Sequence, residues 1–251
     1  MEQSLIGQTA VVTGAGGALG RAVAIALAQC GAKVSCGDLN FGAAQDTAKR
    51  ILSAGYSASA FEVDVADELA VARWHEAVVD KYGPASIVAN VAGVIDRRLL
   101  DELDFTGFME VVGVNLGGPF LVAKNFFKDL ISHPWGRIVN VASVAGLNGY
   151  PFPAYAASKA GVINLTRSLL TDFWGTSVTV NAVCPGAMDT AMFNTQLIPK
   201  IAKRTPIGRI VTVSEVASMV AFLSGPGSSG INGAAIPVDG GESAIFQYFD
   251  N

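Results

Sequence analysis

Two residues in the sequence have the chemical types and the spacing needed to transfer a proton. Tyr155 and Lys159 stand at positions i and i+4 of a predicted helix, so their side chains share one face. A free tyrosine titrates at about pH 10, and a neighbouring ammonium group favours the phenolate and lowers this pKa. The pair is therefore predicted to move a proton to or from a substrate oxygen. Ser143, twelve residues before Tyr155, is predicted to donate a hydrogen bond to the same oxygen.

A glycine-rich segment near the start of the chain is the second feature with a chemical meaning. Residues 13–20 read TGAGGALG and lie between a predicted strand and a predicted helix. Small residues let the backbone approach a pyrophosphate, whose charge the N–H groups of a helix N-terminus can bind. Asp38, 18 residues after Gly20, can accept hydrogen bonds from both hydroxyls of an adenosine ribose. The same carboxylate repels a 2′-phosphate, and positions 15–18 and 39–40 hold no Arg or Lys, so NAD is predicted over NADP.

The composition excludes several classes of protein. The chain is 51% apolar even before its 28 glycines are counted, and 15% charged. Typical globular domains are about 45–50% apolar with glycine included and about 25% charged. A disordered chain is therefore excluded. A formal net charge of −4 without a basic run argues against a nucleic-acid partner.

Membrane insertion and secretion are not expected from the sequence. The best apolar run, residues 22–28, is much shorter than the roughly 20 residues of a spanning helix. The first residues lack the pattern of a secretory signal. The three cysteines lack metal-ligand spacing and are interpreted as buried free thiols in the reducing cytoplasm. They are Cys30, Cys36 and Cys184.

Short apolar runs alternate with longer segments of helical periodicity along the whole chain. The predicted strands are residues 9–13, 32–37, 58–63, 86–90, 137–141, 178–183 and 234–238. The predicted helices are residues 18–30, 67–82, 105–116, 120–131, 154–173 and 214–223. This alternation predicts an α/β fold: one Rossmann-type doubly wound parallel sheet of about seven strands, with helices on both faces. Residues 1–251 are expected to form a single domain, with residues 188–210 as a lid over the substrate.

Six motifs occur in an order and at a spacing that resemble a known family. They are residues 13–20, residues 90–93, the tetrad Asn115, Ser143, Tyr155 and Lys159, Asn181 with Pro185 and Gly186, Thr190, and residues 239–241. Over about residues 5–241 the chain resembles the short-chain dehydrogenase/reductase family in its typical single-domain, NAD-dependent form. A tyrosine and a lysine at this spacing also occur on ordinary helix surfaces, but not with these companions. Three structural positions depart from the family pattern, at Ala18, Ser86 and Val91.

The resemblance implies a role for each member of the tetrad. Tyr155 would be the general acid in reduction and the general base in oxidation. Lys159 would hold the nicotinamide ribose and lower the pKa of Tyr155. Ser143 would orient the substrate oxygen. Asn115 would kink its helix and hold a water molecule on a proton relay.

The resemblance also implies two sets of binding residues. The set expected at the NAD cofactor is Gly14, Gly17, Leu19, Gly20, Asp38, Leu39, Asp64, Val65, Asn90, Ala92, Gly93, Tyr155, Lys159, Pro185, Gly186, Met188 and Thr190. The set expected at the substrate is Ser143, Ala145, Asn148, Tyr150, Tyr155, Met192 and Phe193. No metal site is expected, because neither His75 nor His133 has a partner at ligand spacing in the sequence.

The expected function is an NAD-dependent oxidoreductase that interconverts a secondary alcohol and its ketone, with a hydrophobic or cyclic substrate. One alternative is a 3-ketoacyl-carrier-protein reductase, and another is a cofactor-binding regulator without activity. A homotetramer in the cytoplasm is expected, with a dimer as the alternative. Arg97 and Arg98 are interpreted as a solvated loop, with contact to an acidic substrate as the alternative. The aromatic tail, residues 245–249, is expected to dock on a neighbouring subunit or to close a pocket.

Overall fold

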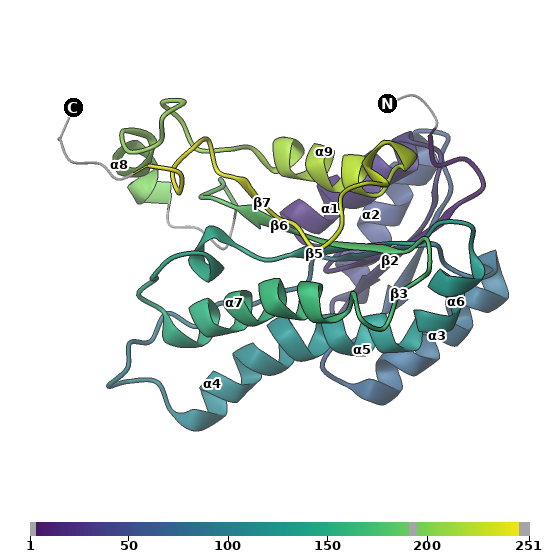
Figure 1. Ribbon diagram of the computed structural model, residues 1–251, viewed down its shortest axis with the longest axis horizontal. Helices are drawn as coiled ribbons and strands as arrows, with labels where there is room; N and C mark the ends of the chain where they lie inside the picture. Colours follow the sequence, from purple (N-terminus) through teal and green to yellow (C-terminus); the bar gives the residue numbers. More distant parts are fainter. Residues whose placement is uncertain (1–3, 191–194, 246–251) are drawn as a thin grey trace.

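In the computed structural model, which describes residues 4–190 and 195–245, seven parallel strands form one sheet (Figure 1). The strands are β1 (Thr9–Thr13), β2 (Lys33–Asp38), β3 (Ala58–Glu62), β4 (Ile87–Asn90), β5 (Arg137–Val141), β6 (Thr179–Pro185) and β7 (Ala235–Val238). Their order across the sheet is β3-β2-β1-β4-β5-β6-β7. This is the strand order of a doubly wound Rossmann-type sheet, so the predicted fold class is confirmed.

Helices cover both faces of the sheet (Figure 1). On one face lie α1 (Ala18–Gln29), α2 (Phe41–Ser53) and α9 (Val213–Leu223). On the other lie α3 (Glu68–Tyr82), α4 (Phe105–Val112), α5 (Gly118–Asn125), α6 (Phe127–Ser132) and α7 (Pro153–Ser168). Because both faces are covered, every residue of β1, β5 and β6 is buried, which explains their apolar runs. All three cysteines are free and buried, as expected.

One helix on the same face as α1 and α9 was not predicted from the sequence. No helix was expected between β2 and β3, yet α2 spans Phe41–Ser53 there. Its buried residues, Ala44, Thr47, Ala48 and Ile51, recur at helical spacing, but three of the four are small or polar. Asn40 nevertheless marks its start, because the Asn40 side chain accepts a hydrogen bond from Ala43 N at 3.1 Å. The signals that could have found α2 were therefore its N-cap and this helical spacing of its buried residues.

A π-helical turn, Gly113–Gly117, joins α4 to α5 and contains Asn115. The sequence predicted two separate helices here, whereas the helical stretch Phe105–Asn125 is continuous. By length and composition alone this stretch could cross a membrane, although 33% of its most apolar window is buried in the fold. The Asn115 side chain is completely buried and bonded to the rest of the protein, so the stretch is anchored within the domain core.

The expected lid is partly described. Within residues 188–210 lie a short 3-10 helix, Thr195–Leu197, and α8 (Ile198–Ala202), which sits outside both helical layers (Figure 1). Met188 forms an isolated parallel bridge with Val211, so the two ends of the segment meet. Met192 and Phe193 lie outside the described residues, as do residues 246–249 of the aromatic tail.

Candidate active site

The turn between β1 and α1 is built for the close approach of backbone segments. Gly14 has a φ of +66°, and a Cβ on this residue would lie 2.8 Å from Ala92 Cα. A Cβ on Gly20 would overlap the carbonyl oxygen of Gly14. Only glycine fits at these two positions, because any side chain would push the turn apart.

The N-terminus of α1 faces the same turn and suits an anion. The helix has 12 residues, its N-cap is Gly17, and its first turn consists of Ala18, Leu19 and Gly20. These residues bring no carboxylate to the free N–H groups, so the positive end of the helix dipole stays available. A pyrophosphate fits this cradle in charge and in the space that the glycines leave.

Asp38 lies at the end of β2, beside the turn. Its Oδ2 accepts a hydrogen bond from Gly16 N at 2.8 Å, and its Oδ1 accepts one from Asn40 N at 2.9 Å. A carboxylate has about four acceptor sites, so both oxygens can accept further bonds from ribose hydroxyls. The residues at this position therefore fit the adenosine end of a nicotinamide dinucleotide.

A cavity of about 550 Å³ runs from Asp38 to the end of β6. Its wall includes every residue of the expected cofactor set except Asn90. Asn90 does not line the cavity: it is buried and donates a hydrogen bond to Asn140 Oδ1 at 2.8 Å. The wall also contains residues that sequence analysis missed, namely Gly16, Ala18, Asn40, Ala43, Val63, Val91, Val94, Val114, Val141 and Ala142. Asn40 and Ala43 were missed because helix α2 was missed.

Ser143, Tyr155 and Lys159 come together at the other end of this cavity. Ser143 follows β5, and its Oγ accepts a hydrogen bond from Ala145 N at 3.1 Å, which fixes the hydroxyl while leaving its proton free to donate. The hydroxyl also lies near Tyr155, where it acts to lower the pKa of the phenol. The Lys159 Nζ donates to the Val141 carbonyl at 2.9 Å and lies 5.8 Å from the centre of the Tyr155 ring.

Asn115, the fourth member of the expected tetrad, stands behind this group and is fully buried. Its Nδ2 donates to the Val94 carbonyl at 2.9 Å and to Ser158 Oγ at 3.0 Å, while its Oδ1 accepts from Val94 N at 2.8 Å. A Cβ on Gly93 would lie 3.2 Å from Asn115 Oδ1 and 3.3 Å from Lys159 Nζ. Asn115 therefore holds the chain after β4 close to Lys159.

The pKa of Tyr155 is raised, which corrects the expectation that Lys159 lowers it. Burial is the largest cause and outweighs the opposing effect of the Ser143 hydroxyl. Lys159 is itself buried, and burial lowers the pKa of its ammonium group to about 8. Its Nζ is bonded to a backbone carbonyl and not to the Tyr155 hydroxyl. Tyr155 therefore keeps its proton at neutral pH, as a general acid must.

The lowered pKa of Lys159 predicts an effect on stability. The folded protein holds this proton less tightly than the unfolded chain, so a buried charge lowers the free energy of unfolding below pH 8. Lys159→Met removes the charge, and we expect the free energy of unfolding at pH 7 to rise by at most about 3 kcal/mol. The gain should shrink between pH 8 and 10.5, where the wild-type lysine loses its proton. Urea unfolding at pH 7 and at high pH measures both effects.

Lys128→Met, on an exposed position of α6, is the matched control and should leave stability unchanged at either pH. A Lys159→Met protein that is less stable than the wild type at pH 7 would contradict the prediction. So would a stability difference that does not change with pH.

The expected substrate residues are only partly gathered at the cavity. Ser143 and Tyr155 line it, whereas Ala145, Asn148 and Tyr150 do not. Tyr150 is nevertheless close, since its ring centre lies 6.1 Å from that of Tyr155. Burial raises the pKa of Tyr150, and the positive charge of Arg97 opposes this.

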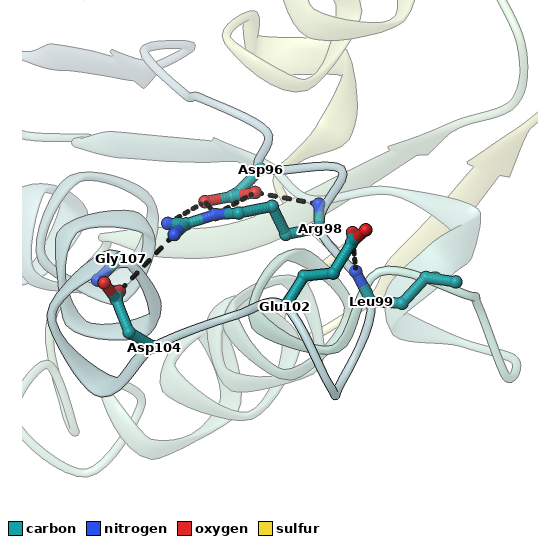
Figure 2. A network of polar contacts seen from close by, with 6 residues as sticks. All are labelled: Asp96, Arg98, Leu99, Glu102, Asp104 and Gly107. Atoms are coloured by element: carbon teal, nitrogen blue, oxygen red, sulfur yellow. Dashed lines mark hydrogen bonds and ion pairs between the residues drawn. The ribbon is translucent and has the colours of Figure 1, made fainter.

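Arg98 is held by acidic side chains of its own loop (Figure 2). Its Nη2 lies 2.7 Å from Asp96 Oδ2, and its Nη1 lies 3.6 Å from Asp104 Oδ1. Asp104 caps α4 by accepting a hydrogen bond from Gly107 N at 2.7 Å. Arg98 thus ties the loop after β4 to the start of α4.

Among the described residues no group of three or more His, Cys, Asp or Glu side chains could hold a metal ion. His75 does have an acidic neighbour that its sequence context did not reveal, because its Nε2 lies 3.2 Å from Asp129 Oδ2. Asp129 Oδ2 also accepts a hydrogen bond from Ala85 N at 3.0 Å. The pair therefore joins α3 to α6 and to the segment that precedes β4.

The fold and the site together define an oxidoreductase of the dinucleotide-binding class. A family model described as enoyl-(acyl carrier protein) reductase matches residues 14–243. The cis-4-hydroxycyclohexanecarboxylate dehydrogenase of Sinomonas cyclohexanicum is 36% identical over 250 residues, covering 98% of this chain and 100% of that protein. The 3-oxoacyl-(acyl-carrier-protein) reductase of Pseudomonas aeruginosa is 33% identical over 244 residues, covering 95% and 98%. The chain belongs to the short-chain dehydrogenase/reductase family.

A solved structure supports the same assignment. The actinorhodin polyketide ketoreductase with NADPH superposes with a TM-score of 0.91 at 34% identity, over 98% of this chain and 100% of that one. The relatives are dehydrogenases and reductases that act on alcohol or ketone groups. The expected family membership is thereby confirmed.

Proposed function

We propose that the protein is an NAD-dependent dehydrogenase that interconverts a secondary alcohol and its ketone. The observation that carries the proposal is one cavity with Asp38 at one end and Ser143, Tyr155 and Lys159 at the other. Asp38 favours two free ribose hydroxyls and disfavours a 2′-phosphate, which supports NAD over NADP. The other end supports acid–base chemistry at a substrate oxygen.

The residues of the chain donate a proton, orient the substrate oxygen and bind the ribose of the cofactor. A nicotinamide dinucleotide, when bound, supplies the hydride for reduction and accepts it for oxidation. In reduction, the Tyr155 hydroxyl donates its proton to the ketone oxygen, which Ser143 holds through a second hydrogen bond. Lys159 uses one donor on the Val141 carbonyl, which leaves two N–H groups for ribose hydroxyls.

A cyclic or hydrophobic substrate is favoured by the surroundings of Tyr155. Tyr150 and Phe152 form an edge-on aromatic pair with ring centres 5.5 Å apart, and Tyr150 lies next to Tyr155. The Sinomonas relative is named for a hydroxylated cyclohexane ring with a carboxylate.

A screen of secondary alcohols tests the proposal. Purified protein is incubated with NAD⁺ or NADP⁺ and with cyclohexanols, hydroxycyclohexanecarboxylates, hydroxysteroids, polyols or hydroxyacyl thioesters, and the absorbance of the reduced nicotinamide is followed. We expect oxidation of a ring alcohol, with NAD⁺ favoured at least tenfold, about 1.4 kcal/mol, over NADP⁺. A preference for NADP⁺ at equal concentration would refute the role of Asp38. Activity confined to hydroxyacyl thioesters would favour the carrier-protein reductase instead.

We also propose that the protein associates with copies of itself. The helical stretch from α4 to α5 exposes large apolar side chains, with Phe105 77%, Phe120 48% and Met109 46% exposed. Exposed apolar side chains gathered on one stretch are costly in water and mark association surfaces. This surface supports a dimer or tetramer that buries α4 and α5.

A further inference from the structure

Two charged side chains form hydrogen bonds with the turn between β1 and α1, where the pyrophosphate is expected to bind. Asp38 Oδ2 accepts a hydrogen bond from Gly16 N at 2.8 Å. On the opposite side of the same residue, Arg21 Nη2 donates to the Gly16 carbonyl at 3.0 Å. A Cβ on Gly16 would lie 2.6 Å from the Ala43 Cβ, so the turn also fits closely against α2.

Thr47 on α2 forms two further hydrogen bonds, one with this turn and one with Arg21. Its Oγ1 donates to the Ala15 carbonyl at 2.8 Å and accepts a hydrogen bond from Arg21 Nε at 3.1 Å. Thr47 is fully buried, so its bond to the Ala15 carbonyl is shielded from water. The hydroxyl therefore joins the turn to both Arg21 and α2.

These contacts fix two consecutive peptide groups. The peptide between Ala15 and Gly16 is held at its oxygen by Thr47 and at its N–H by Asp38. The next peptide is held at its oxygen by Arg21. Glycine peptides rotate easily, and this rotation would disturb the N–H groups that lead into α1. Holding both planes pre-organises the anion site, which saves ordering entropy when a ligand binds.

We propose that Arg21 and Thr47 are positioning residues for the pyrophosphate of the cofactor, and that they are coupled to Asp38 through the Gly16 peptide. This inference rests on the proposed function, since it requires that the protein binds a nicotinamide dinucleotide. Ribose recognition and pyrophosphate binding then form one unit. Removing the Asp38 carboxylate therefore lowers the affinity for the dinucleotide in two ways. The ribose loses a hydrogen-bond acceptor, and the turn loses the bond that holds the Gly16 peptide.

Binding measurements test the proposal without relying on activity. NADH affinity is measured by fluorescence titration, and the affinities for ADP and adenosine by calorimetry or ligand NMR. Arg21→Met should weaken NADH and ADP about tenfold, equivalent to the loss of one charge-assisted hydrogen bond, and adenosine less than about twofold. Thr47→Val, which keeps the shape of the side chain, should weaken NADH about threefold to tenfold. Arg50→Met, on an exposed position of α2, is the matched control and should bind as the wild type does.

A double-mutant cycle tests the coupling to Asp38. If both side chains act through Gly16, the NADH affinity lost by the Arg21→Met, Asp38→Ala double variant should fall short of the product of the single losses by at least about threefold. Multiplicative losses would overturn the coupling. A lowered melting temperature with unchanged NADH and ADP affinity in both Arg21→Met and Thr47→Val would overturn the positioning role. A wild type that binds neither NADH nor NADPH would instead refute the proposed function.

Discussion

Replacing Tyr155 with phenylalanine is expected to lower turnover by about a thousandfold while leaving NADH affinity unchanged. General acid–base catalysis by one side chain contributes about 10²–10⁴-fold, and Tyr155 is the acid at the centre of the site. Phenylalanine keeps the ring that lies beside Tyr150, so the cavity should keep its shape. Steady-state turnover and NADH fluorescence titration, both on the folded variant, measure the two quantities.

Tyr56→Phe is a suitable control, because Tyr56 is 40% exposed and does not line the cavity. This control should keep full turnover. If the Tyr155→Phe variant kept turnover near that of the wild type, proton transfer would have to come from another group. The proposed mechanism would then be wrong.

Gly20→Ala is expected to weaken NADH binding by at least about a hundredfold. The added methyl group would overlap the Gly14 carbonyl oxygen, and a backbone atom cannot move aside as the end of a side chain can. The turn would have to open, which would spread the N–H groups that face the pyrophosphate. Loss of pre-organised contacts with a charged ligand on this scale is about 3 kcal/mol. NADH titration together with thermal unfolding measures the effect.

Gly230→Ala is the matched control, since a Cβ there meets nothing within 4 Å. It should bind NADH as the wild type does. Gly17→Ala should be milder than Gly20→Ala, because its Cβ would lie 3.4 Å from the same oxygen, an ordinary contact. Equal NADH affinity in Gly20→Ala and the wild type would show that the turn does not form the pyrophosphate site.

The elements that the sequence predicted best are those that a single physical pattern determines. Strands β1 and β5 were predicted with the bounds that the structure shows, because burial on both faces leaves short segments rich in β-branched residues. Helix α2 was missed because its buried stripe, although at helical spacing, consists of two alanines, Thr47 and Ile51 and so holds few large apolar side chains. Two residues of the cavity wall, Asn40 and Ala43, were missed for the same reason, because they belong to that helix or its cap.

The chemistry of the site was predictable in kind but not in detail. Residue types and spacing brought Ser143, Tyr155 and Lys159 to one place. They could not show that burial raises the pKa of Tyr155, because the balance between desolvation and a neighbouring charge depends on atomic distances. Asn90 illustrates the same limit, since only packing decides whether the last residue of a buried strand faces the cavity or another asparagine.

The π turn between α4 and α5 restricts how this stretch can change in length during evolution. A π turn contains one residue more than an α-helical turn, and each helical residue turns the chain by about 100°. Deleting one residue within Gly113–Gly117 would therefore give a regular helix, and one half would rotate relative to the other. Either Asn115 would swing away from Val94 and Ser158, or the apolar side chains exposed on α4 would turn to a new direction. After a single insertion or deletion here, Asn115 could no longer support the active site while α4 presents the proposed association surface in its present direction.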